Sequence, residues 1–174
     1  MLPTLTTARL VLRAPTVADH DALWRHWTVP QVRRYLLDDA VIDEAASRTF
    51  IEDCAALNPR GLGLWLIASR EGALLGHLAL LPETDLGREN AALAGDVEFG
   101  ISLAPQAWGQ GYAGEALRAV LDHGTGAAGL QRILGVADEP NHASRRLQER
   151  AGFTFLCHMP GKVFPLIVSQ YRKG

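Results

Sequence analysis

Three glycines, Gly109, Gly111 and Gly114, follow a stretch of alternating apolar residues and open a stretch with helical periodicity. Glycines at such a junction let successive backbone N–H groups point at one anion, and the positive end of the following helix adds to the attraction. These residues therefore predict a cradle for a phosphate or pyrophosphate group. The glycines alone do not identify the molecule that carries the phosphate.

The neighbouring residues do not match either of two well-known phosphate-binding loops. A Walker A loop needs Lys and then Ser or Thr after its last glycine, whereas Tyr112 follows Gly111. A dinucleotide-binding loop leaves its first strand directly, but a segment with Pro105 separates strand and glycines here. Only 36 residues follow Asp138, the candidate ribose-binding acid, which is too few for the second half of such a sheet.

Periodicity predicts the elements that position this loop. Alternating or continuous apolar runs predict strands at 10–12, 64–69, 74–81, 96–103, 132–137, 153–159 and 164–171. Spacings of three and four residues predict helices at 19–27, 43–57, 112–127 and 142–151, the first of them ended by Pro30. The polar, glycine-containing stretch 82–95 is interpreted as a loop. The order is mixed α+β, and no linker or repeat divides residues 1–174, so we expect a single domain.

Bulk properties narrow the class of protein. The chain has 174 residues, a formal net charge of -2 and a sequence pI near 6.3, which argues against a nucleic-acid partner. Two distant cysteines and six histidines without ligand-like spacing predict no metal site. Neither a signal peptide nor an apolar run of membrane-spanning length is evident, so we expect no membrane partner and a cytoplasmic location.

The chain resembles the GNAT superfamily of N-acetyltransferases along nearly its whole length. Gln106-x-x-Gly109-x-Gly111 is similar to the family signature Q/R-x-x-G-x-G/A, between a strand and a helix as the family requires. The stretch 7–13, TARLVLR, looks like the opening of the RimJ/RimL-type branch. Asn141-x-x-Ser144-x-x-Leu147, followed by Gly-Phe at 152–153, resembles a later motif of the same branch.

The resemblance implies a fold and a cofactor. The GNAT fold has a central, mostly antiparallel seven-stranded sheet with about four helices on both faces, and its fourth and fifth strands, here 96–103 and 132–137, splay apart. The cofactor would be acetyl-CoA, whose pantetheine arm lies in that gap. The implied cofactor-binding residues are Ile101, Ser102, Leu103, Gln106, Gly109, Gln110, Gly111, Tyr112, Ala113, Gly114, Asn141 and Ser144.

The resemblance also implies catalytic roles. A neutral amine must attack the thioester, so some group has to take its proton. Glu98 is the implied base, directly or through water; as an alternative, it is a solvated residue or pairs with an arginine. Many GNAT enzymes place a proton-donating tyrosine where this chain has Gln148, so Ser144 is the substitute that would hydrogen-bond the sulfur. The alternative for Ser144 is a helix-capping role.

The acceptor implied is a primary amine, most simply the α-amino group of a protein or peptide, as in ribosomal-protein acetylation, attacked directly in a ternary complex. Two alternatives stay open. The acceptor could be a small-molecule amine of the aminoglycoside or polyamine kind, or the chain could be a non-catalytic acyl-CoA-binding module. A homodimer is compatible with either. Trp24, Trp27 and Tyr35 would line the acceptor cleft or belong to the core. Four acidic residues nearby would attract a cation or lie in solvent: Asp38, Asp39, Asp43 and Glu44.

Overall fold

A single eight-stranded sheet forms the centre of the molecule, in the strand order β1-β2-β3-β4-β5-β6-β8-β7. This computed structural model describes residues 1–82 and 86–173. The strands are β1 (Leu5–Thr6), β2 (Leu10–Arg13), β3 (Gly63–Ser69), β4 (Leu74–Pro82), β5 (Val97–Leu103), β6 (Ile133–Asp138), β7 (Thr154–Met159) and β8 (Leu166–Tyr171). Neighbouring strands are antiparallel, except that β5 and β6 are parallel.

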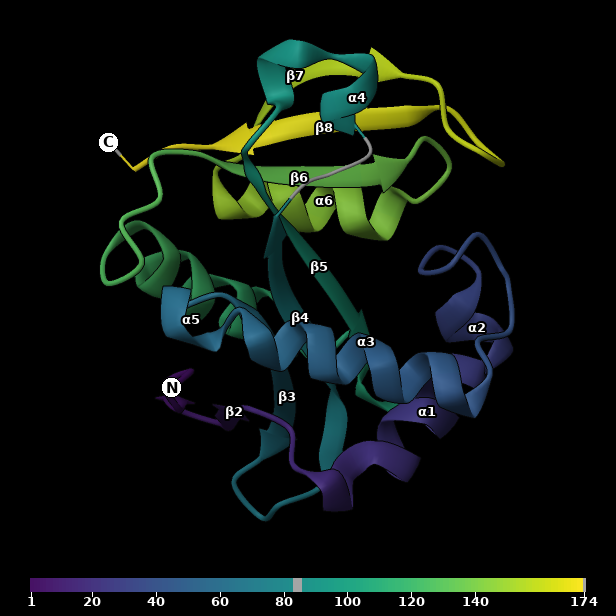
Figure 1. Cartoon of the computed structure of the whole chain (residues 1–174), viewed down its shortest axis with the longest axis vertical. Coiled ribbons are helices and arrows are strands. Elements are labelled where there is room, and N and C mark those ends of the chain that lie inside the picture. Colours follow the sequence, from purple (N-terminus) through teal and green to yellow (C-terminus); the bar gives the residue numbers. More distant parts are fainter. Residues whose placement is uncertain (83–85, 174) are drawn as a thin grey trace.

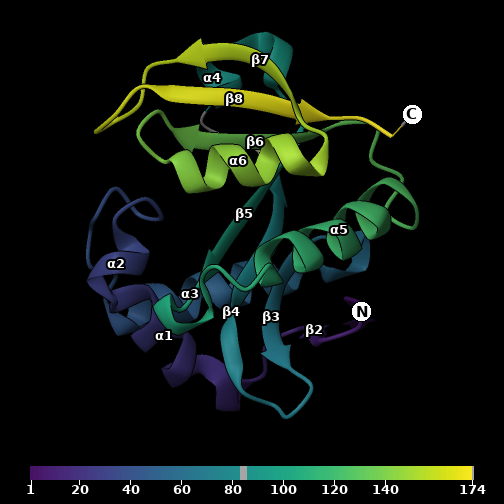
Figure 2. The same cartoon turned by 180° about the vertical axis from the view of Figure 1, so that it is seen from behind.

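Helices cover both faces of the sheet. They are α1 (His20–Thr28), α2 (Pro30–Arg33), α3 (Glu44–Ala56), α4 (Leu86–Glu89), α5 (Tyr112–Thr125) and α6 (His142–Ala151). Helices α1 and α3 lie against one face of β3 and β4, while α5 and α6 lie on the other side, as the views from front and back show (Figure 1, Figure 2). The α+β class and the four longer helices predicted from periodicity are confirmed.

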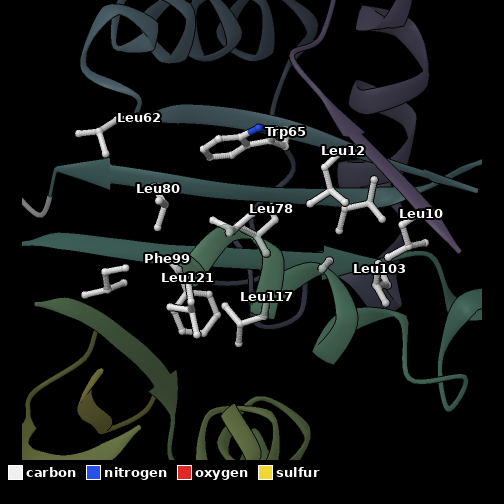
Figure 3. Close-up of a cluster of buried hydrophobic side chains, with 14 of the residues drawn as sticks. Leu10, Leu12, Leu62, Trp65, Leu78, Leu80, Phe99, Leu103, Leu117 and Leu121 are labelled. Carbon is white, nitrogen blue, oxygen red and sulfur yellow. The ribbon is translucent and has the colours of Figure 1, made fainter. Parts of the chain in front are cut away.

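The main hydrophobic core fills the space between the sheet and α5. Alternate strand residues such as Leu78, Leu80 and Phe99 pack there against Leu117 and Leu121 of α5 (Figure 3). These residues are at most 3% exposed. A second, smaller cluster lies on the opposite face under α1 and α3. The two cores show that successive residues of the central strands face opposite layers, which matters for the site because β5 borders it.

The sheet opens between β5 and β6. Their parallel pairing covers only Val97, Phe99 and the residue between them, so Gly100 to Leu103 continue without a β6 partner. The strands β6, β8 and β7 then run in a different direction from β3, β4 and β5 (Figure 1). The splay predicted for the strands 96–103 and 132–137 is therefore present.

The structure corrects three details of the sequence-based expectation. The sheet has eight strands rather than seven, because the two-residue strand β1 pairs with β2 and is too short to give a periodic signal. Pro30 ends α1 but also begins α2, a position where its missing N–H costs nothing. In the predicted loop 82–95, α4 and a 3-10 turn at Ala91–Leu93 form because Leu86 and Leu93 are buried against β6 and β8; residues 83–85 lie outside the described residues.

Candidate active site

The glycine-rich loop has the geometry of an anion cradle. Gly109 and Gly111 have φ values of 73° and 79°, in the left-handed region that favours glycine. Gly111 is the N-cap of the 14-residue helix α5. The first backbone N–H groups of a helix have no partner within it, so those of Tyr112, Ala113 and Gly114 are available to an anion. The predicted loop therefore has the conformation that its role requires.

Arg9, a residue that sequence reasoning did not assign to the site, binds this loop to the start of the sheet. Its Nη1 donates to the carbonyl of Gln110 at 2.9 Å, and its Nε donates to Oε2 of Glu115 at 2.7 Å. Its guanidinium also lies 4.5 Å from the centre of the Tyr112 ring. The Arg9 in the opening motif was the available signal, but its partner is 106 positions away and only folding brings the two together.

A cavity of about 660 Å³ occupies the gap between β5 and β6. Seven of the residues predicted to be catalytic or to bind the cofactor line it: Glu98, Ile101, Ser102, Leu103, Ala113, Asn141 and Ser144. The other predicted residues, which are Gln106, Gly109, Gln110, Gly111, Tyr112 and Gly114, lie instead on the loop and first turn of α5 beside it. The site thus has two adjoining parts, an anion cradle and a cavity that reaches into the sheet.

The cavity is lined from both faces of the sheet. Glu98 is the cross-strand partner of Leu81, which packs against the core under α1 and α3, so Glu98 faces that layer. Ser102 lies four residues further along β5 and faces the same layer. Ser144, in the first turn of α6, lies in the opposite layer, where Leu147 packs against the α5 core. Glu98 and Ser144 therefore approach one cavity from opposite sides.

Ser144 is not the cap of its helix. Asn141 is the N-cap, and its side-chain oxygen accepts from the backbone N–H of Ser144 at 3.1 Å. The hydroxyl of Ser144 instead accepts from Nε2 of Gln148 at 3.2 Å, and Oε1 of Gln148 accepts from Oγ of Ser169 at 2.6 Å. Gln148 is only 3% exposed, so this chain holds its amide in one orientation. The helix-capping role that was the alternative for Ser144 is therefore filled by Asn141.

Trp108 lies within the predicted loop 106–111, but the sequence analysis did not assign it to the site. Its side chain lines the cavity, although 50% of the residue is exposed. The indole Nε1 donates to the carbonyl of Leu103 at 2.7 Å, which fixes the ring at the end of β5. Its position inside the glycine-rich signature was the available signal.

The end of the cavity towards α2 contains part of the predicted acceptor region. Tyr35 and Asp38 line the cavity, and Tyr35 contacts Phe164 with ring centres 6.2 Å apart. Asp138 also lines it; burial, with Asp38 as a lesser cause, raises the pKa of its carboxyl. Trp27 is 2% exposed and belongs to the core.

The predicted acidic residues all have structural partners, including Asp38, which pairs with Lys162 at 3.6 Å. Asp39 pairs with Arg33 at 3.0 Å, and Asp43 caps α3 by accepting from the backbone of Ala46. Glu44 pairs with Arg48 at 2.7 Å. Of the predicted acidic patch, only Asp38 is among the residues that line the cavity.

One group of potential metal ligands forms away from the cavity, among the residues that the structure describes. His20, Asp21 and Glu44 bring their ligand atoms within 4.8 Å of one another, a proximity that the histidine spacing did not reveal. Both carboxylates contact the guanidinium of Arg48, at 3.6 and 2.7 Å. Since Arg48 already pairs with both carboxylates, no metal is assigned to this cluster.

Comparison with known proteins identifies the family. A family model described as an acetyltransferase (GNAT) domain matches residues 9–154. The chain is 32% identical over 157 residues to the uncharacterized N-acetyltransferase YoaA of Bacillus subtilis, covering 88% of this chain and 84% of that protein. It is 31% identical over 160 residues to an FsC-acetyl coenzyme A-N(2)-transacetylase of Aspergillus fumigatus, covering 87% of this chain and 65% of that protein. The chain belongs to the GNAT acetyltransferase family.

A solved structure agrees with this assignment at the level of the fold. RimL, described as a ribosomal L7/L12 alpha-N-protein acetyltransferase in complex with coenzyme A, superposes with a TM-score of 0.79 at 18% identity, over 98% of each chain. The predicted RimL-like fold is thereby confirmed. The chain is an acetyl-transferring enzyme, and its cofactor is acetyl-CoA, as in GNAT enzymes generally. Among the described residues, no helix is long and apolar enough to cross a membrane.

The residues present suit this cofactor. Two left-handed glycines and the unpaired N–H groups of α5 match a pyrophosphate, and the adjoining cavity offers an open stretch of β5 backbone to an elongated amide-containing arm. A Cβ added at Gly109 would meet no atom within 4 Å, so the cradle is open on that side. The cradle and the adjoining cavity are therefore consistent with acetyl-CoA in shape and chemistry.

Proposed function

We propose that this enzyme acetylates a primary amine, most simply the α-amino group of a protein or peptide, by direct attack within a ternary complex. One observation carries the proposal: a single cavity is lined by Glu98 from one face of the sheet and by Ser144 from the other. Direct transfer needs an acceptor and a donor that meet from two sides, with a proton acceptor at one side and a proton donor at the other. The arrangement of these two residues supplies both.

The coenzyme would be held by the two parts of the site. The N–H groups from Gly109 to Gly114, with Gln106 and Gln110 beside them, would bind the pyrophosphate. The backbone of Ile101 to Leu103, which has no β6 partner, would bind the pantetheine arm next to the Trp108 ring. Asn141 lines the same cavity and would contact the coenzyme in addition to capping α6.

When bound, acetyl-CoA supplies the acetyl group as an activated thioester. Glu98 takes the proton of the acceptor ammonium, directly or through water, so that the neutral amine can form the new C–N bond. A backbone N–H near Ile101 would polarise the thioester carbonyl. Ser144 would donate a hydrogen bond to the leaving sulfur; because Gln148 donates to its oxygen, the Ser144 hydroxyl proton is available for this role. The leaving thiolate would take up the proton that the acylated nitrogen releases as the amide forms.

The acceptor end favours a cationic amine. Three carboxylates line the cavity, Glu98, Asp38 and Asp138, against one guanidinium, that of Arg34. Asp38 also pairs with Lys162 at 3.6 Å, so Glu98 and Asp138 carry most of the attraction for an ammonium group. The RimL described above acts on the α-amino group of a ribosomal protein, and its fold is similar to this one. A small-molecule acceptor is the second candidate, because the Aspergillus relative is named for transfer to an N(2) atom of FsC.

A thiol-release assay with acetyl-CoA tests the proposal. The acceptor panel pairs peptides that carry free N-termini with the same peptides blocked at the N-terminus, and adds aminoglycosides and polyamines. We expect release with the free peptides and loss with the blocked ones, with a mass increase of one acetyl group located at the N-terminus. Release with the small amines alone would select the second candidate. No acceptor-dependent release across the panel would contradict the proposed function.

A further inference from the structure

The side chain of Ser102 lies between two buried histidines. Its Oγ is 2.7 Å from Nε2 of His26 in α1 and 3.0 Å from Nδ1 of His77 in β4. His77 pairs with Ser102 across the strands, so both face the same layer. Nε1 of Trp27 donates to the same Nδ1 of His77 at 3.0 Å. Ser102 also lines the cavity, whereas both histidines are less than 8% exposed.

The direction of these hydrogen bonds follows from the partner that can only donate. The indole nitrogen of Trp27 can donate a hydrogen bond but cannot accept one. Nδ1 of His77 must therefore be unprotonated and accept from Trp27. The hydroxyl of Ser102 also donates to that nitrogen, since two lone pairs would otherwise face each other at 3.0 Å. The indole N–H and the hydroxyl therefore share the one lone pair of Nδ1. Because the one proton of Ser102 is used in this way, Nε2 of His26 has to be the donor to Oγ.

Both imidazoles are neutral at physiological pH. Burial lowers the pKa of His26 to about 4, and burial together with the neighbouring His26 lowers that of His77 to about 3. A neutral His26 has one N–H, which this network places on Nε2. The hydroxyl oxygen of Ser102 accepts that N–H with one lone pair and keeps a second lone pair. Its proton is bonded to His77, so Ser102 can accept a hydrogen bond from a ligand but is not free to donate one.

We propose that Oγ of Ser102, oriented by His26 and His77, accepts a hydrogen bond from an N–H of the attacking amine and thereby positions the acceptor. This inference rests on the proposed function and concerns the same cavity. It assigns the Ser102 side chain to the acceptor, whereas only its backbone is expected to bind the coenzyme. Glu98 faces the same layer four residues earlier along β5, roughly 13 Å away at the usual rise of a strand. An amine bound to Ser102 would therefore pass its proton to Glu98 through water rather than by direct contact. An acceptor-only oxygen selects N–H groups over ligand groups that offer lone pairs.

Ser102→Ala tests the inference in steady-state kinetics, with the best acceptor of the panel. We expect the KM for the acceptor to rise about tenfold, the effect of losing one hydrogen bond to an amine, while kcat falls less. The Kd of acetyl-CoA, measured by calorimetry, should stay as in the wild type because the backbone of β5 is retained. Ser102→Thr keeps the hydroxyl and should restore most of the affinity for the acceptor.

Ser47→Ala is the matched control, because Ser47 is another buried serine, 0% exposed, in contact with a histidine, with its Oγ 3.3 Å from Nε2 of His20. It should lower stability without changing the acceptor KM. A Ser102→Ala enzyme with wild-type acceptor KM would overturn the inference and leave the proposed function intact. Equal losses in Ser102→Ala and Ser47→Ala would also overturn it, since they would indicate a structural effect. A wild-type enzyme that acetylates no amine would overturn the proposed function and this inference with it.

Discussion

Nε2 of Gln148 donates a hydrogen bond to Oγ of Ser144 at 3.2 Å, one turn earlier on the same helix. Gln148 stands where many GNAT enzymes carry a proton-donating tyrosine, so this pair shows how the chain departs from that pattern. The amide cannot protonate a thiolate, but it occupies a lone pair of Ser144 and leaves the hydroxyl proton available. Ser169 is buried and is not among the residues that line the cavity. Its hydroxyl donates to the other end of the amide at 2.6 Å and lies 3.2 Å from the carbonyl of Gly135, so the orientation of the amide is set from the protein interior.

Ser144→Ala should lower kcat and moderately lower stability. We expect kcat to fall roughly tenfold to a hundredfold, since a hydrogen bond to a developing charge is lost. The free energy of unfolding should fall by about 1–3 kcal/mol, because the buried amide of Gln148 loses its acceptor. In Asn141→Ala the loss of the cap should cost about 1 kcal/mol of unfolding free energy. A Ser144→Ala enzyme that is destabilised but fully active would contradict the assigned role.

Glu98→Gln should reduce kcat by about a hundredfold or more at neutral pH, the usual contribution of a general base. The amide keeps the shape of the side chain but cannot take a proton. We also expect the rise of activity with pH to change form in the variant, since the remaining rate would depend on the amine that is already neutral. A rate that matches the wild type across the pH range would exclude Glu98 as the base.

Gly111→Ala should weaken acetyl-CoA binding, whereas Gly114→Ala should not. The φ of 79° at Gly111 costs a residue with a Cβ about 1 kcal/mol or more, so the loop would relax away from the cradle. Gly114 lies inside α5, where an added Cβ would meet only Leu147, at 4.0 Å. Alanine there favours the helix and keeps the backbone N–H. Calorimetric titration with acetyl-CoA compares the two, and equal losses would argue against the conformational explanation.

Gly100→Val should impair the acceptor rather than the fold. Gly100 lines the cavity, and an added Cβ would meet no atom within 4 Å, so a side chain would project into open space. We expect kcat/KM for the acceptor to fall at least tenfold while acetyl-CoA still binds. Gly135→Ala is the contrasting change, because its Cβ would come within 2.9 Å of Gln148 and Phe99. That variant should lose about 1–3 kcal/mol of stability, as overpacked cores do.

Stability should decrease as the pH falls below about 6.5. Burial lowers the pKa of His26 to about 4 and that of His77 to about 3, from the ordinary value of about 6.5. The unfolded chain therefore binds more protons between these values, and the stabilisation present above pH 6.5 is lost on acidification, by up to about 1.4 kcal/mol per pH unit for each imidazole. Urea unfolding at pH 7.5 and 5.0 measures this. His77→Asn, whose side-chain oxygen can still accept from Trp27, should give a shallower dependence; an unchanged slope would rule out His77 as a contributor.

Local sequence patterns were sufficient to predict the glycine-rich cradle and the main strands and helices. Gly109, Gly111 and Gln106 lie within a few positions, and the backbone conformation that they require is encoded locally, so the cradle could be predicted from the sequence. The alternation along β5 and the spacing along α5 could be read for the same reason. The short strand β1 and the helix α4 could not, because two or four residues give no period and their burial depends on distant partners.

The sequence by itself determined the family, the donor and the order of the main elements, because these depend on neighbouring residues. Only the tertiary structure decided which of the candidates share a cavity, that Glu98 and Ser144 enter it from opposite faces, and that Ser102 lies between His26 and His77. It also decided that Asn141 rather than Ser144 caps α6. The physical reason is distance along the chain: Ser102 is 76 positions from His26, and no local pattern specifies contacts that form only when separate layers pack together.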